Sequence, residues 1–150
     1  MEPMEWRRAE YTITTDTARV SLDVVHQFLS RESYWAKGIP RERVARSIEN
    51  AMCFTLLHAD RHIGFARVIS DCATVAYLGD VFILEEYRKR GLSKWLLECI
   101  LSHPDLQGLR RWILGTADAH GLYARYGFTP LAAPERFMEK HNPEAYPRPQ

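Results

Sequence analysis

The pattern of apolar and polar positions in the first third of the chain predicts a strand followed by helices. Residues 11–15 alternate β-branched and aromatic side chains, which is typical of a strand, and Asp16 follows in a favourable position to cap a helix. Apolar residues recur at helical spacing over 20–29, so a first helix is expected to reach Ser30. After a loop, residues 41–50 predict a second, short helix with one narrow apolar face.

The middle of the chain changes to strand periodicity. Residues 54–57 and 63–69 alternate as the two strands of a hairpin would, and the polar stretch 58–62 forms the expected turn. Residues 73–84 are rich in Val, Tyr, Phe and Ile, which predicts a long central strand. Gly79 interrupts that strand, and such a glycine often marks a bulge, so we expect the strand to separate from a neighbour there.

The last third predicts a long helix over 91–102, ended by Pro104, and then a strand over 112–116. A short helix is expected over 118–126, with Gly127 at its end. Three further expectations complete the chain: closing strands at 128–129 and 137–139, and an irregular tail over 142–150.

The resulting order is β, α, α, β, β, β, α, β, α, β. It predicts a layered α/β protein whose mixed sheet contains an antiparallel meander followed by a βαβ crossover. The length of 150 residues fits one domain, 1–150, with a core over about residues 10–140. No repeat or linker-like stretch divides it.

Composition narrows the possible partners and compartments. Lys and Arg number 20 against 19 Asp and Glu, a balance that argues against nucleic-acid binding. The longest apolar run, 51–57, is far shorter than the ~20 residues that cross a bilayer, so no membrane span is expected. The start of the chain has no signal-peptide core, which favours the cytoplasm. The cysteines, Cys53, Cys72 and Cys99, are expected to be reduced and buried.

The junction between the central strand and the long helix carries the most specific chemistry. Helix N-termini expose unpaired N–H groups and a positive dipole end, and Gly91 lets a ligand approach them closely. Basic residues at 88–90 reinforce this, so the junction is a candidate phosphate site. The spacing R-x-x-G-x-S is short, and by itself it fits an exposed charged turn equally well.

Two longer segments resemble a known family. Residues 78–97 resemble the acetyl-CoA-binding motif of the GNAT superfamily of N-acetyltransferases, and residues 119–128 resemble its second motif, in which a tyrosine precedes Gly-Phe by three intervening residues. The resemblance implies a GNAT-like sheet with splayed central strands and acetyl-CoA as cosubstrate, with no metal. The reaction that it implies is transfer of an acetyl group to a primary amine in a ternary complex.

The resemblance also implies how the cosubstrate binds. The backbone of the strand would pair with the pantetheine arm, and an N–H of Phe82 or Ile83 would polarise the thioester. Ser93 replaces the usual Gly or Ala, and Asp118 replaces Asn and is expected to cap a helix. The implied binding residues are Val81, Phe82 and Ile83, and, for the pyrophosphate, Arg88, Lys89, Arg90, Gly91, Leu92 and Ser93.

Four other side chains are assigned by motif position or neighbourhood. Tyr123 is the implied general acid that protonates the leaving thiolate, and its alternative role is helix packing. Asp80 is a candidate general base, or else a salt-bridged strand residue. Tyr34 and Trp35 are candidates for the wall of the acceptor pocket, with plain packing as the alternative.

Other possibilities belong to different classes. The chain can instead be a catalytically silent acyl-CoA sensor that keeps the phosphate site. His58, Asp60 and His62 are close enough to suggest a metal, but a hairpin turn is normally polar and no fourth ligand is evident. The expected partner is a small-molecule or peptide amine. Pairing of the closing strands between subunits would give a homodimer.

Overall fold

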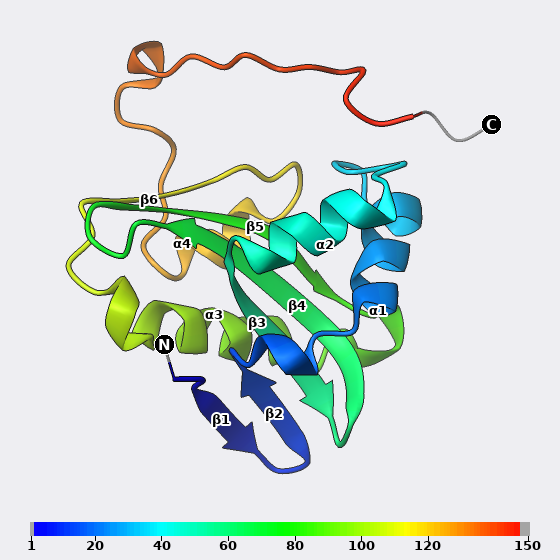
Figure 1. Ribbon diagram of the computed structural model, residues 1–150. Helices are drawn as coiled ribbons and strands as arrows, with labels where there is room; N and C mark the ends of the chain where they lie inside the picture. The colour runs from blue at the N-terminus through cyan, green and yellow to red at the C-terminus, as the bar shows by residue number, and fades with distance from the viewer. Residues whose placement is uncertain (1, 148–150) are drawn as a thin grey trace.

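A mixed sheet of six strands forms the centre of the computed structural model, which describes residues 2–147 (Figure 1). The strands lie in chain order across the sheet. Neighbours are antiparallel except β5 and β6, which are parallel. The α/β class, the antiparallel meander and the final crossover are therefore as predicted. The strands are β1 Glu5–Arg8, β2 Tyr11–Thr14, β3 Met52–His58, β4 Arg61–Ser70, β5 Val75–Ile83 and β6 Arg111–Leu114.

Helices cover both faces of this sheet (Figure 1). One face carries α1 (Leu22–Gln27), a π-helical turn (Phe28–Glu32) and α2 (Arg41–Glu49). The other carries α3 (Leu92–Ser102) and α4 (His120–Ala124). The 3-10 turns are Thr17–Arg19, Glu85–Tyr87, Pro104–Leu106 and Pro134–Arg136.

Alternation along the strands supplies a separate core to each face, because successive side chains point to opposite sides of a sheet. Phe54 and its neighbour Cys53 show this: Phe54 packs with α3, and Cys53 packs with α1 and α2. On the α2 face, Phe82 stacks on Phe28 with ring centroids 4.1 Å apart. Such an aromatic pair stabilises the fold by about 0.5–1.5 kcal/mol beyond its buried area.

The sheet opens between β5 and β6. Pairing of these strands begins at Val75 and ends at Leu78, opposite Leu114, while β5 continues to Ile83. The ladder between β4 and β5 is also irregular here, and Asp80 adopts a left-handed φ of 53°. The bulge and the separation thus lie where the glycine at 79 predicted them.

The first helix is interrupted instead of continuous. The Asp16 side chain accepts the N–H of Ala18, but it caps only a 3-10 turn. Ser21 then caps α1 by accepting the N–H of Val24. The short edge strand β1 was not predicted, since its sequence Glu-Trp-Arg-Arg is mostly charged and has no apolar alternation.

The prediction of closing strands is wrong. Residues 128–147 contain no strand and instead form a tail that crosses from the β6 side of the molecule toward α1 and α2 (Figure 1). Prolines at 130 and 134 remove backbone donors that a ladder needs. Phe137 instead lies under the guanidinium of Arg111, 4.8 Å from it.

The cysteines differ from expectation at one position. Cys53 and Cys99 are buried, and burial raises the pKa of each thiol to about 12. Cys72 is exposed, so the expectation that all three are buried is wrong. It lies in the β4–β5 turn with a φ of 61°, where the side chain faces solvent.

Within residues 2–147 no helix has the length and apolar character needed to span a bilayer.

Candidate active site

The turn between β5 and α3 leaves the start of α3 open. Gly91 precedes the helix in a left-handed conformation, with a φ of 75°, and no side chain caps the first turn. Lys89 is also left-handed. The first N–H groups of a helix lack intrahelical partners, and together with the dipole they attract an anion. The uncapped turn can therefore accept an anion such as phosphate.

Basic side chains are fixed around this turn by the protein itself. The Nε of Arg88 donates to the carbonyl of Ile83, at 3.0 Å. Arg90 donates to the Tyr11 hydroxyl at 3.1 Å, and its guanidinium lies over the Tyr87 ring. Positive charge is thus held beside the open N–H groups before any ligand arrives, which reduces the entropy lost on binding.

The backbone of β5 offers one free edge at the opening. Leu84 donates its N–H to Ile63 on β4, at 2.8 Å, and Phe82 opposes Phe65. Backbone groups of successive residues in a ladder point to opposite edges, so Phe82 faces β4 and Ile83 faces the opening. Of the two candidate donors to a thioester, the geometry favours Ile83. Leu92 is buried, so only its backbone is available to a ligand.

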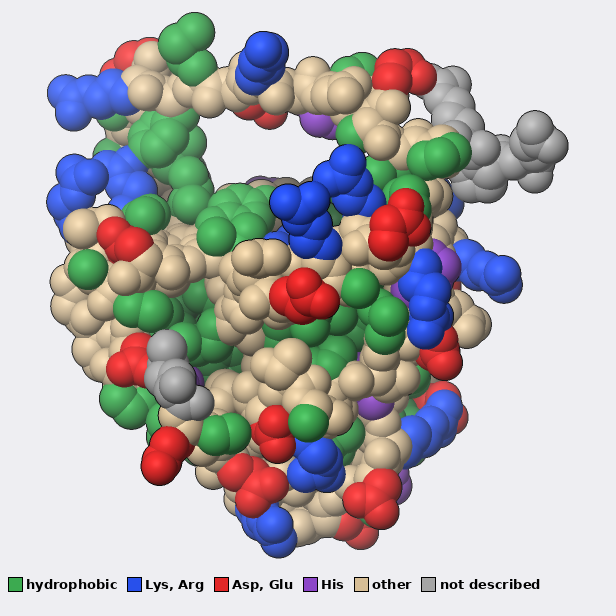
Figure 2. Space-filling model, viewed as in Figure 1, with side chains coloured by type: hydrophobic (Ala, Val, Ile, Leu, Met, Phe, Trp, Pro, Cys, Tyr) green, Lys and Arg blue, Asp and Glu red, His purple; other side chains and the backbone are tan. Residues whose placement is uncertain are grey.

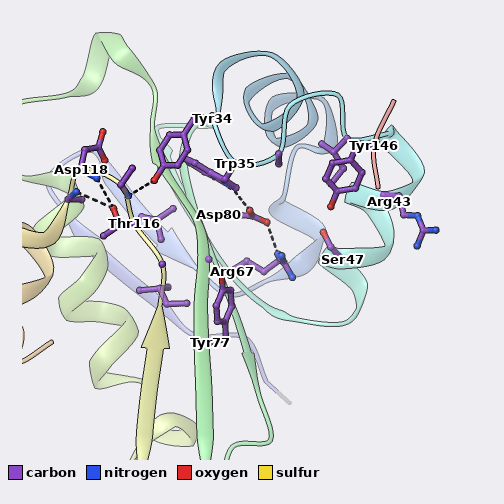
Figure 3. Close-up of a pocket in the computed structure, with 18 of the residues that line it drawn as sticks. Tyr34, Trp35, Arg43, Ser47, Arg67, Tyr77, Asp80, Thr116, Asp118 and Tyr146 are labelled. Carbon is purple, nitrogen blue, oxygen red and sulfur yellow. Dashed lines mark hydrogen bonds and ion pairs between the residues drawn. The ribbon is translucent and has the colours of Figure 1, made fainter. Parts of the chain in front are cut away.

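A cavity of about 950 Å³ continues from the opening toward α2 (Figure 3). We call it the central cavity. The tail passes over a hollow on this face of the molecule, with Lys and Arg side chains beside it (Figure 2). The residues that line the central cavity are Tyr34, Trp35, Ala36, Ile39, Arg43, Arg46, Ser47, Asn50, Arg67, Tyr77, Leu78, Gly79, Asp80, Val81, Gly115, Thr116, Ala117, Asp118, Ala119, Tyr123 and Tyr146.

Tyr34 and Trp35 connect the two separated strands. The indole N–H of Trp35 donates to Asp80 Oδ1 at 2.9 Å, and the Tyr34 hydroxyl accepts the N–H of Ala117 at 2.7 Å (Figure 3). The π-helical turn directly before them ends α1 and leads the chain to the cavity. Because both side chains line the cavity and are exposed, they form part of its wall and not of the core.

Asp80 forms an ion pair with Arg67 inside the cavity. Its Oδ2 lies 2.8 Å from Arg67 Nε, and the side chains are 11% and 18% exposed. The ion pair matches the second of the two roles considered for Asp80, and the role of general base stays a prediction. Each residue is the single charge in an otherwise apolar stretch of strand, and that pattern could have identified Arg67, which sequence reasoning missed.

Tyr123 reaches the cavity from α4. It is 8% exposed, and its ring meets that of Phe128 edge to face, 5.8 Å away. Burial raises the pKa of the Tyr123 phenol, and Tyr34 and Asp118 raise it further. The phenol is therefore protonated at neutral pH and can only donate a proton. Tyr123 combines a packing role with a position at the cavity wall.

The expected capping role of Asp118 is wrong. The hydroxyl of Thr116 accepts the N–H groups of Asp118 and Ala119, at 3.4 and 3.1 Å. The helix begins two residues later than predicted, at His120, which leaves the Asp118 carboxylate outside the capping position. It lines the central cavity instead.

The histidines near the β3–β4 turn have other partners. His58 lies between Glu10 and Tyr87, each 2.9 Å from a ring nitrogen. His62 is buried and accepts the N–H of Ser21. Burial lowers the pKa of His62 to about 4. In the part of the chain that the structure describes, no three His, Cys, Asp or Glu side chains gather as a metal site would require.

Sequence reasoning missed several residues of the cavity wall. Three of them form a polar row on α2, and a helical plot of residues 41–49 places that row to one side of the apolar stripe of Val44 and Ile48. Tyr77 and Tyr146 had no comparable signal, because an exposed tyrosine in a strand or an irregular tail is unremarkable. The polar row consists of Arg43, Arg46 and Ser47.

Comparison with known proteins shows which family the chain resembles. A protein of Xanthomonas campestris pv. campestris, described as belonging to the GNAT family, is 51% identical, with a TM-score of 0.89 over 91% of this chain and 96% of its own. A Gibberella zeae protein described as an acetyltransferase is 28% identical over 83% of this chain and 81% of its own. A GNAT acetyltransferase from Elizabethkingia anophelis, solved with acetyl-CoA bound, shares 14% identity over 93% of this chain and 92% of its own, with a TM-score of 0.62, and shows the fold alone.

The match to a family model covers more than half of the chain and includes both motifs. It spans residues 49–130, from the end of α2 to just beyond α4. With the splayed sheet and the uncapped turn before α3, this establishes that the chain belongs to the GNAT acetyltransferase family.

Proposed function

We propose that the protein transfers an acetyl group from acetyl-CoA to a primary amine by direct attack in a ternary complex. One observation carries the proposal: the opening between β5 and β6 borders a cavity that contains a buried, protonated phenol, and β5 leads from this opening to an uncapped helix N-terminus. Acetyl-CoA supplies the activated acetyl group. The turn 88–93 holds its pyrophosphate, and the free edge of β5 at Val81 and Ile83 pairs with its pantetheine arm.

The transfer exchanges one bond at the thioester carbon and develops charge at two atoms, the carbonyl oxygen and the sulfur. The amine nitrogen attacks the thioester carbon, so an N–C bond forms and the C–S bond breaks. The Ile83 N–H donates to the carbonyl oxygen as negative charge develops there. Tyr123 gives its phenolic proton to the departing sulfur and regains one from solvent.

The nucleophile needs a base, because an alkylamine with a pKa of about 10.4 is neutral in only about one molecule in a few thousand at neutral pH. Asp80 and Asp118 are the carboxylates that line the central cavity. Asp80 is the proposed acceptor of that proton, directly or through water, and Arg67 and Trp35 hold it in place.

A panel of primary amines incubated with acetyl-CoA, with release of free thiol as the readout, tests the proposal. We expect turnover that depends on the amine. Saturable acetyl-CoA binding in calorimetry without turnover for any amine would instead support the acyl-CoA sensor. Release of thiol at the same rate with and without amine would show hydrolysis and contradict transfer.

A further inference from the structure

The central cavity is electrically asymmetric along its length (Figure 3). Asp118 and Thr116 lie at one end, beside the start of α4, and Arg43 and Ser47 of α2 lie at the other. Tyr34, Trp35 and the Asp80–Arg67 pair lie between the two ends. A ligand that fills the cavity therefore meets acidic charge near Tyr123 and basic charge near α2.

The basic end is built by one face of α2. Arg43, Arg46, Ser47 and Asn50 follow at spacings of three, one and three residues, so they share a face, and all four line the cavity. The acidic residues of the same helix, Glu42 and Glu49, do not line it. Helical periodicity thus segregates positive charge toward the cavity.

The arginines at this end have donors that the protein leaves unused. No carboxylate of residues 2–147 lies within 4.0 Å of the side chains of Arg43 or Arg46, whereas Arg41 on the same helix pairs with Asp23. Arg67 uses its Nε for Asp80, and its two Nη groups have no acceptor among those same residues. A guanidinium carries five N–H donors in a planar fork that suits carboxylate or phosphate.

We infer that the acceptor amine carries an anionic group, a carboxylate or a phosphate, which binds Arg46 at the α2 end of the central cavity and the unused Nη groups of Arg67 next to that end. The inference rests on the proposed function and names the substrate class of that site. The aromatic walls formed by Trp35 and Tyr77 accommodate the part of the acceptor between its amine and its anion. The amine end then faces Tyr123, where the transfer occurs.

Matched amines that differ in the anion test this assignment. The carboxylate arm compares 4-(aminomethyl)benzoate, whose ring separates the amine from the carboxylate, with 4-(aminomethyl)benzamide, and the phosphate arm compares phosphoethanolamine with ethanolamine. Acetyl transfer gives kcat/KM, and inhibition of the better substrate gives the binding of each poor one. We expect at least one anionic member to exceed its neutral partner about tenfold or more, as expected for a charged hydrogen bond.

The variant Arg46→Gln tests whether Arg46 binds the anionic group. It should reduce that preference about tenfold through KM, with kcat little changed, and Arg46→Lys should restore part of it. Arg41→Gln is the matched control, since it removes the same charge from the same helix outside the cavity, and it should leave the preference intact. Preference unaffected by Arg46→Gln, or neutral partners acetylated as well as anionic ones, would overturn the inference.

Failure of the proposed function would look different. If no amine is acetylated, calorimetry with 4-(aminomethyl)benzoate and phosphoethanolamine still decides the question. Binding that Arg46→Gln abolishes and Arg41→Gln preserves would support the anion site without transfer. No binding of either anionic probe would overturn the anion site.

Discussion

The two sides of the site, one at the turn before α3 and the other at the α2 end of the central cavity, are built in contrasting ways. The α3 side comes from one continuous stretch, 81–93, and presents mainly backbone N–H groups. The α2 side gathers side chains from the loop before α2, from α2 itself, from β4 and from the tail. Backbone groups keep their positions whatever side chains they carry, whereas the side chains of the α2 side can change without disturbing the sheet. The comparison teaches that the proposed cosubstrate site and the proposed acceptor site depend on different kinds of group, backbone on one side and side chains on the other.

The largest expected effect lies where the two sides meet. Tyr123→Phe removes the proposed proton donor and should lower kcat about 100-fold or more, the usual range for a general acid. Its packing against Phe128 is retained, so acetyl-CoA affinity in calorimetry should barely change. An unchanged kcat would remove Tyr123 from the mechanism.

Tyr126→Phe is the matched control for that experiment. Tyr126 is the next tyrosine along the chain, and its hydroxyl donates to the Lys94 carbonyl at 3.2 Å outside the central cavity. We expect kcat to change less than about threefold, because one exposed hydrogen bond contributes about 1 kcal/mol or less. Burial raises the pKa of Tyr123 above the ordinary tyrosine value, so the alkaline fall in wild-type activity that marks loss of the phenolic proton should come only at a pH beyond that value.

A charge reversal tests the α3 side. Arg88→Glu places a carboxylate beside the start of α3 and should weaken acetyl-CoA binding by about tenfold or more, measured by calorimetry. The acceptor preference should not change. Arg110→Glu makes the same change at an exposed site away from the turn 88–93, and equal affinity losses for the two variants would refute the phosphate assignment.

A smaller effect is expected on the α2 side. Trp35→Phe keeps the aromatic wall but removes the donor to Asp80 Oδ1, so the carboxylate has one fewer constraint. We expect KM for the acceptor to rise about threefold to tenfold while KM for acetyl-CoA stays within twofold. An equal rise in both KM values would show that Trp35 affects the binding of acetyl-CoA as much as that of the acceptor, and would contradict its assignment to the acceptor side.

The smallest effect concerns the buried thiols. Cys99→Ala should leave kcat within about twofold, because a thiol with a pKa of about 12 carries almost no thiolate at neutral pH. A large loss of kcat without loss of stability would indicate an acyl-enzyme instead of direct transfer. Cys72 is exposed and its thiol can react with reagents that detect free thiol, so these assays should use protein that carries the substitution Cys72→Ser.

The α3 side could be predicted from the sequence because its elements are local. The helix predicted over 91–102 forms over Leu92–Ser102, with Gly91 directly before it, and the sheet separates near Gly79 as predicted. All of these features depend on neighbouring residues. Its hydrogen-bond directions were not predictable, since the choice between Phe82 and Ile83 depends on the register with β4.

The α2 side was harder to predict because its contacts are long-range. The hydrogen bond between Trp35 and Asp80 joins residues 45 positions apart, and that between Tyr34 and Ala117 joins residues 83 apart. Tyr34 and Trp35 were identified as candidates, but their partners depend on how the π-helical turn directs the loop. The prediction of closing strands in the tail was wrong for a related reason, since the apolar residues at 128 and 137 pack on side chains and not on a strand.

The course of the tail has a practical consequence for anyone who purifies the enzyme. Tyr146 borders the central cavity, so an affinity tag joined after Gln150 begins only four residues along the chain from a side chain of the cavity wall. A tag before β1 begins at the far edge of the sheet, separated from β4 by two strands. Kinetic surveys of amines should therefore carry the tag at the amino end, or compare the two placements before any substrate is dismissed.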